Sequence, residues 1–156
     1  MPRIDIDSLK ESNEFLNDLY QNVTSAIFIA DSDARIYHFN DSFRTLFYKP
    51  EDQILKKLCG NVMGCIFAVE EGKNCGETTQ CEECILRNRI IKTFTEKVPA
   101  YKEELRRKFL INGEVLEKYF VFTTKYLNYH GDEMILVIVD DVTEQVQQKE
   151  QIQSYY

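Results

Sequence analysis

Residues 25–43 read SAIFIADSDARIYHFNDSF, and this segment narrows the choice of fold more than any other part of the chain. It begins with a run of strand-forming residues, DSD at 31–33 is typical of a turn, and residues 35–40 indicate a second strand. Asn40 or Asp41 then provides an N-cap for a short helix. We therefore predict a β-hairpin that leads directly into a helix.

The remaining elements follow from apolar spacing and from turn residues on either side of this hairpin. Helices are predicted over residues 7–22, from Pro50 to about Leu58, over about 80–97 with Thr78 or Thr79 as cap, and from 140–144 to the end. Strands are predicted over 101–111, 115–127 and 134–139. This order predicts an α+β fold, a five-stranded antiparallel sheet with its helices on one face. The expected divisions are an N-terminal amphipathic helix (1–22), a sheet domain (23–141) with a cysteine-rich loop (59–84), and a C-terminal linker helix (142–156).

Composition is that of an ordinary globular chain. Of 156 residues, 44% are hydrophobic and 29% charged, and the formal net charge is −7. A negative surface repels phosphate backbones, which argues against nucleic acid as a direct partner. No apolar run approaches the ~20 residues of a membrane span, and the first residues lack the apolar core of a signal peptide. We therefore expect a cytoplasmic protein without direct membrane insertion.

Four cysteines fall within twenty residues, with the spacing C-x9-C-x5-C-x2-C: Cys65, Cys75, Cys81 and Cys84. In a reducing cytosol, clustered thiols are more often metal ligands or redox groups than structural disulfides. The C-x2-C pair at a helix start can place two sulfurs on one metal ion, and the other two complete a four-thiolate shell. We predict a metal centre, either zinc or an iron–sulfur cluster, and the spacing does not choose between them. A thiol switch and unligated core cysteines remain alternatives.

Cys59 lies just upstream of the four and is interpreted as a small buried residue rather than a ligand. The whole segment 59–84 holds four of the six glycines and few apolar residues. It is therefore predicted to be a long irregular loop, of the kind that is usually functional or held by a cross-link.

Both ends of the sheet domain resemble the PAS domains of bacterial sensor proteins. NDSF at 40–43 matches the Asn before a short helix in the PAS start, and VDDVTE at 139–144 resembles the Asp-Ile-Thr-Glu close that leads into a signalling helix. The resemblance covers roughly residues 12–150. It implies a regulatory input module without enzymatic activity of its own.

The cysteine segment also looks like a cysteine-bearing subset of PAS domains, in GC at 64–65, NCG at 74–76, CEEC at 81–84 and RN at 87–88. Some PAS sensors bind an iron–sulfur cluster through four cysteines and respond to oxygen. The resemblance implies that a cluster could be bound here too, although the cysteine spacing does not match theirs residue by residue. The flavin-photosensor segment NCRFLQ is absent. His38 and His130 are predicted in a strand and a turn, whereas heme-binding PAS domains usually present their axial histidine on the long helix.

The terminal helices suggest partners. Leu9, Leu16 and Val23 recur every seven residues, which suits a homodimer across a two-fold axis. The last helix has no stop signal and is expected to continue as a coiled coil towards a downstream output domain such as a kinase or cyclase. The alternative functions are a metal-free thiol switch and a small-ligand or protein-interaction module.

Two other groups are given ordinary structural roles. Charged residues at 103–108 (EELRRK) are interpreted as the solvated face of a strand. A set of phenylalanines is interpreted as core, with a small-ligand pocket among them as the alternative: Phe28, Phe39, Phe43, Phe47, Phe109, Phe120 and Phe122.

Overall fold

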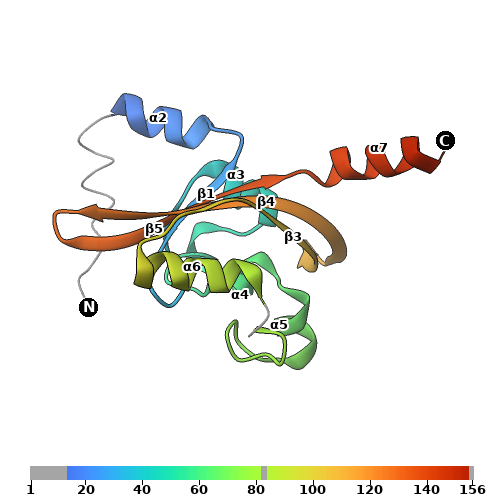
Figure 1. The fold of residues 1–156 in the computed structure, drawn as a ribbon, viewed down its shortest axis with the longest axis horizontal. Coiled ribbons are helices and arrows are strands. Elements are labelled where there is room, and N and C mark those ends of the chain that lie inside the picture. Colours follow the sequence, from blue (N-terminus) through green and yellow to red (C-terminus); the bar gives the residue numbers. More distant parts are fainter. Residues whose placement is uncertain (1–13, 82–83, 155–156) are drawn as a thin grey trace.

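The fold is built on a single antiparallel sheet, seen in a computed structural model that describes residues 14–81 and 84–154 (Figure 1). Its strands are β1 (Ala26–Ala30), β2 (Ile36–Phe39), β3 (Ala100–Ile111), β4 (Glu114–Tyr129) and β5 (Asp132–Asp141). They lie in the order β2-β1-β5-β4-β3. The predicted α+β fold with a five-stranded antiparallel sheet is confirmed, as are the opening hairpin and the three later strands.

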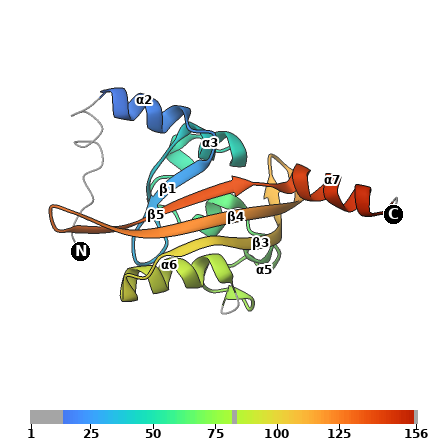
Figure 2. The ribbon, with the colours of Figure 1, turned by 45° about the horizontal axis from the view of Figure 1, so that its top comes forward.

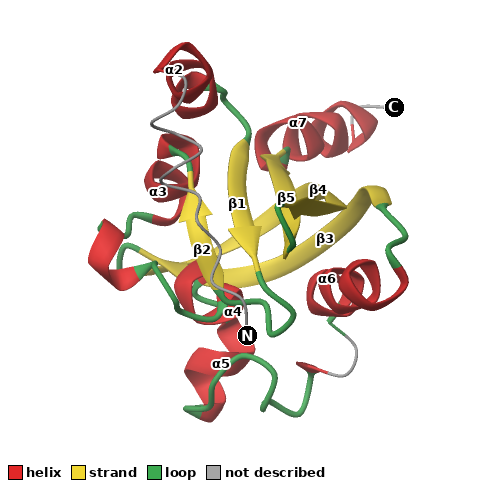
Figure 3. Ribbon diagram, turned by 90° about the vertical axis from the view of Figure 1, so that its left-hand side faces the viewer, coloured by secondary structure: helices red, strands yellow, loops and turns green. Residues whose placement is uncertain are grey.

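The helices are α2 (Glu14–Asn22), α3 (Asp41–Phe47), the 3-10 turn η1 (Glu51–Gln53), α4 (Cys59–Met63), α5 (Ile66–Glu71), α6 (Ile85–Glu96) and α7 (Thr143–Ser154). Helices α4 and α5 contact β3, α6 contacts β3 to β5, and α3 contacts β1. Figure 3 shows α4, α5 and α6 beside β3, whereas α2 lies next to α3. In Figures 1 and 2, α7 extends beyond the end of the sheet. No helix in residues 14–81 and 84–154 is long and apolar enough to cross a membrane.

An aromatic core fills the space between the sheet and its helices. The ring centres of Phe43 and Phe47 lie 5.0 Å apart. The ring centre of Phe47 lies 6.3 Å from that of Phe109 and 5.9 Å from that of Phe120. Each of these four side chains is almost completely buried, and burying a phenylalanine contributes roughly 1.5–3 kcal/mol. The predicted role of the phenylalanines as core residues is confirmed.

Asn40 joins three elements at the start of the domain. Its Oδ1 accepts the N–H of Ile27 in β1 at 2.9 Å and the N–H of Phe43 in α3 at 3.1 Å. Its amide donates to the carbonyls of Tyr20, at the end of α2, and of Ser25. Asn40 is fully buried, so these bonds are needed to satisfy its polar atoms. The predicted N-cap is therefore confirmed at Asn40.

The start of α7 is fastened to the sheet. The Asp141 carboxylate accepts the Thr143 N–H at 3.0 Å and the Lys118 ammonium at 3.0 Å. The Thr143 hydroxyl in turn accepts the N–H of Tyr119 in β4 at 2.9 Å. Burial opposes the charge of Asp141, but Thr143 and Lys118 outweigh it and lower the pKa of that carboxyl. The polar residues that precede α7 thus hold its first turn on β4.

Three predictions about secondary structure in the middle of the chain are wrong. The segment 59–84 is not one irregular loop, because it contains α4 and α5, which bury Val62, Met63 and Ile66. The helix predicted from Pro50 is only the turn η1. Helix α6 starts at Ile85 with Cys84 as its N-cap, so the expected cap at Thr78 or Thr79 is not used. Residues 7–13 of the predicted first helix, including Leu9, lie outside the described residues.

Candidate functional site

All five cysteines line one cavity of about 20 Å³, although they come from different segments. Cys59 begins α4, Cys65 caps α5, Cys84 caps α6, and Cys75 and Cys81 belong to the loop between α5 and α6. Strand β3 supplies one wall through Leu105, Arg107 and Phe109. The four cysteines predicted as ligands therefore face the same space, and Cys59 faces it with them.

A close backbone contact fixes Cys65 against the sheet. Gly64, with φ of +80°, ends α4, and its carbonyl accepts the Leu110 N–H at 2.8 Å. A Cβ at Gly64 would lie 2.1 Å from the Leu110 carbonyl oxygen, so both the backbone angle and the space require glycine. Cys65 consequently forms an isolated β-bridge with Phe109 of β3.

Asn61 holds the next cysteine. The Cys75 N–H donates to Asn61 Oδ1 at 2.6 Å, which brings Cys75 back over the first turn of α4. The Cys59 thiol then donates to the Cys75 sulfur, and together with the Gly60 N–H and Arg87 it outweighs burial and lowers the pKa of Cys75 to about 6. The same contact and its complete burial raise the pKa of Cys59. In this pair the lowered pKa favours the thiolate on Cys75, and the raised pKa favours the protonated form of Cys59.

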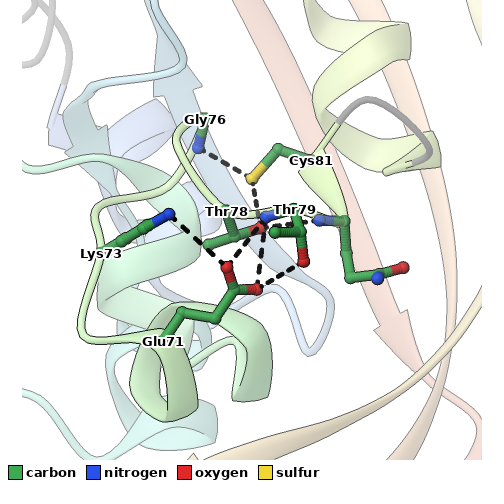
Figure 4. Close-up of polar contacts among 7 residues, drawn as sticks. Glu71, Lys73, Gly76, Thr78, Thr79 and Cys81 are labelled. Atoms are coloured by element: carbon green, nitrogen blue, oxygen red, sulfur yellow. Dashed lines mark hydrogen bonds and ion pairs between the residues drawn. The ribbon is translucent and has the colours of Figure 1, made fainter.

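Polar groups of the loop hold Cys81 (Figure 4). Its sulfur accepts the Gly76 N–H at 3.1 Å and lies 2.8 Å from the Thr78 hydroxyl. The Glu71 carboxylate, at the end of α5, accepts both the N–H and the hydroxyl of Thr79 at 3.0 Å. These contacts tie the loop to α5 and hold Cys81 in its position.

Two arginines point at the sulfurs. Arg107 Nη1 lies 3.3 Å from the Cys84 sulfur and 3.7 Å from that of Cys65, and Arg87 Nη1 lies 3.7 Å from the Cys75 sulfur. Burial disfavours the charge of Arg107, but the two sulfurs outweigh it and raise the pKa of that guanidinium. The interpretation of residues 103–108 as a wholly solvated face is therefore wrong at Arg107.

The donor set suits a soft or borderline metal, because thiolates are the preferred ligands of zinc and of iron–sulfur clusters. Nearby arginines favour the thiolate form that coordination requires. Within residues 14–81 and 84–154, however, no three cysteine, histidine or carboxylate side chains converge tightly enough to coordinate one ion. The residues fit the group by chemistry and by sharing one cavity, and coordination would draw the sulfurs together.

The two histidines lie elsewhere, as predicted. His38 is a buried residue of β2 whose Nδ1 is 3.1 Å from the Tyr20 hydroxyl. His130 lies in the β4–β5 turn, with its ring edge-on to Tyr129 at 4.2 Å. Neither lines the cysteine cavity.

Comparisons with known proteins place the fold. No family model and no curated protein sequence matches the chain. Among solved structures, it is similar to the PAS domain of BvgS from Bordetella pertussis, with a TM-score of 0.55 and 18% identity over 96% of this chain and 99% of that one. A PAS domain from Colwellia psychrerythraea has a TM-score of 0.58 and 12% sequence identity, over 84% of this chain and 97% of that one. The PAS domain of nitrogen regulation protein NR(II) from Vibrio parahaemolyticus has a TM-score of 0.51 and 12% sequence identity, over 83% of this chain and 99% of that one. The chain therefore has the PAS fold.

Proposed function

We propose that this chain is the sensory input module of a signalling protein, and that Cys65, Cys75, Cys81 and Cys84 hold a metal centre. In this proposal the chain acts in the cytoplasm and has no enzymatic activity of its own. One observation carries it: the cysteines of four separate segments line the same cavity, and two arginines point at their sulfurs. A set of unligated core cysteines would have no need for cations beside it.

The cavity has room for a metal centre. The centre of a water-sized atom can move through about 20 Å³ between the cysteines, so a single ion such as Zn²⁺ fits there. The volume does not choose between zinc and an iron–sulfur cluster. When bound, zinc would fix the loop that carries Cys75 and Cys81 to the sheet, whereas a cluster would add one-electron redox chemistry.

A route from the cavity to the C-terminal helix supports signalling through α7. Arg107 pairs across β3 and β4 with Lys118, and Lys118 forms the ion pair with Asp141 at 3.0 Å. Asp141 and Thr143 hold the first turn of α7. A change in the charge beside Arg107 would thus reach α7 through one cross-strand pair, and from there a downstream output domain.

The terminal helices support a homodimer. In α2, Phe15, Leu16 and Leu19 are exposed although they are large and apolar, and in α7 Ile152 is exposed as well. An apolar stripe of this kind is stabilised by a second copy of the same helix. Sedimentation analysis of the wild type and of a Leu16→Glu, Leu19→Glu variant tests this part of the proposal, and a wild-type monomer would refute it.

A second candidate, a metal-free thiol switch, rests on the contact between Cys59 and Cys75. Two neighbouring thiols and one molecule of hydrogen peroxide give one disulfide and two molecules of water. Mass spectrometry of the metal-free protein after peroxide treatment would detect the loss of two hydrogens and the linked peptide pair. That disulfide in freshly isolated, metal-free protein would favour the switch over the metal centre.

The deciding experiment is metal analysis with a UV–visible spectrum on protein purified without oxygen. Cys84→Ser should lose the metal because Cys84 belongs to the predicted ligand set, whereas Cys59→Ser should keep it. Iron, sulfide and absorbance near ~400 nm would identify a cluster, and one zinc per chain would identify a single-ion site. Full metal content in Cys84→Ser would refute this ligand set.

A further inference from the structure

Within residues 14–81 and 84–154, two half-buried arginines of the cysteine cavity form no ion pair with a carboxylate. Buried or half-buried guanidinium groups are usually paired with carboxylates. Among the ion pairs of residues 14–81 and 84–154, none involves Arg87 or Arg107. Their guanidinium groups instead donate to sulfur: Arg87 to Cys75, and Arg107 to Cys84 and Cys65.

Both side chains are held in place by their surroundings. The Arg107 guanidinium stacks over the Phe67 ring, 5.2 Å from its centre. The Arg87 guanidinium lies so close to the loop backbone that a Cβ at Gly76 would be 2.7 Å from its Cζ. Gly76 has a φ of +95°, so its backbone conformation favours glycine. The two guanidinium groups are therefore packed against Phe67 and against the loop at Gly76.

We infer that Arg87 and Arg107 are the counter-charges of the bound metal centre, and that together they select a complex carrying two negative charges. This inference rests on the proposed function. Four thiolates around one divalent ion, or around a cluster core of charge two plus, leave a net charge of minus two. Burying such a dianion is costly unless cations neutralise it. Arg87 of α6 and Arg107 of β3 supply the two positive charges that this requires.

Arg106 offers a matched control. It precedes Arg107 on β3, is exposed, pairs with Glu117 at 3.1 Å and stacks on Tyr119 at 4.8 Å. Because successive residues of a strand point to opposite faces, Arg106 has the same charge as Arg107 and almost the same backbone position, but does not contact the sulfurs.

The test uses the reduced chain after metal removal, titrated with Zn²⁺ against a chromophoric chelator. Arg107→Gln and Arg87→Gln should each weaken zinc binding by about tenfold or more, as expected when an outer-shell partner of a metal site is lost. Arg107→Lys should recover most of the affinity, because lysine keeps the charge. Arg106→Gln should bind as the wild type does. The melting temperature of the metal-free protein should not fall in either Gln variant.

Each outcome distinguishes the inference from its premise. Zinc binding by the wild type that is unchanged in Arg87→Gln and Arg107→Gln would overturn the inference and leave the proposed function standing. A loss of affinity that Arg107→Lys does not restore, with a lower melting temperature without metal, would make Arg107 a packing residue. A wild type that binds neither zinc nor iron would overturn both. If the protein carries a cluster, its midpoint potential replaces the zinc titration, and each Gln variant should lower that potential.

Discussion

The region around Asn40 and the region around the cysteines use buried polar groups in opposite ways. Asn40 has each of its polar atoms bonded to the backbone of a neighbouring element, within a scaffold of α2, β1 and α3. In the cysteine cavity, the guanidinium groups of Arg87 and Arg107 donate to sulfur atoms, and neither forms an ion pair with a carboxylate of the described residues. The hydrogen-bonding groups of Asn40 are thus satisfied by the protein itself.

This difference separates structure from function within one small domain. A polar group whose bonds are all internal gains nothing from a ligand, and its main effect is on folding. A cavity with fixed positive charges and thiols is stabilised further when a group of matching charge binds. Substitutions in the two regions should therefore affect different measurements, and the predictions below test that separation.

The largest expected effect is on folding, at Asn40. Asn40→Ala leaves the N–H groups of Ile27 and Phe43 without their acceptor inside the protein, so the free energy of unfolding should fall by about 3 kcal/mol. Asn61→Ala is the matched control from the cysteine region, because Asn61 is exposed and holds Cys75. It should cost about 1 kcal/mol or less and should weaken metal binding.

Urea unfolding of both variants, with metal removed, checks this contrast. Equal losses of stability in Asn40→Ala and Asn61→Ala would mean that the two regions do not differ in the way described. Normal metal binding by Asn61→Ala would mean that the position of Cys75 does not depend on Asn61.

The sheet was predictable because its pattern is local. Strand formers alternate with turn residues, and NDSF at 40–43 marks the cap at Asn40. The prediction of an irregular loop over residues 59–84 was wrong. Helices α4 and α5 have five and six residues, too few for a helical period to be recognised or for isolated stability. They form because the fold buries Val62, Met63 and Ile66, and this information is not in the local sequence.

The cysteines were predicted as a group, but the contacts of Arg87 and Arg107 with their sulfurs were not. Residues 103–108 look like a solvated charged face when charge alone is considered. The alternation of side chains along a strand could have indicated that Arg107 faces the core. Leu105 and Phe109 are buried, and Arg107 lies between them on the same face. Arg87 could not be found in this way, because its approach to Cys75 depends on the turn at Gly76.

A smaller effect is expected at Gly60, where both the zinc affinity and the stability of the metal-free protein should fall. A Cβ at Gly60 would lie 2.6 Å from the Cys75 sulfur, so Gly60→Ala must displace Cys75. We expect zinc affinity to fall by tenfold or more, whereas stability without metal falls by about 1–2 kcal/mol. Chelator competition and urea unfolding measure the two quantities.

Cys75→Ala provides the control for Gly60. In that background the alanine at position 60 meets no sulfur, although the Cβ of residue 75 would still lie 2.9 Å from it. The added cost of Gly60→Ala in stability should therefore shrink in part, as a double-mutant cycle would reveal. Full additivity of the two substitutions would show that the contact with Cys75 does not limit position 60.

The smallest effect concerns a single proton. In the metal-free protein, the Cys59 thiol donates to Cys75 and is the largest cause that lowers the pKa of Cys75 to about 6. Since the thiolate is the reactive form, alkylation of Cys75 by iodoacetamide should be slow below this pH, rise through it, and level off above it. Cys59→Ala removes the donor, so the midpoint should move upward towards the ordinary value of a thiol. Cys65→Ala, which removes another cysteine of the cavity, should leave the midpoint in place. Peptide mapping by mass spectrometry reads the modification at Cys75 itself. A wild-type midpoint at the ordinary thiol value, or no shift in Cys59→Ala, would show that the cavity does not stabilise this thiolate and would weaken its contrast with the Asn40 region.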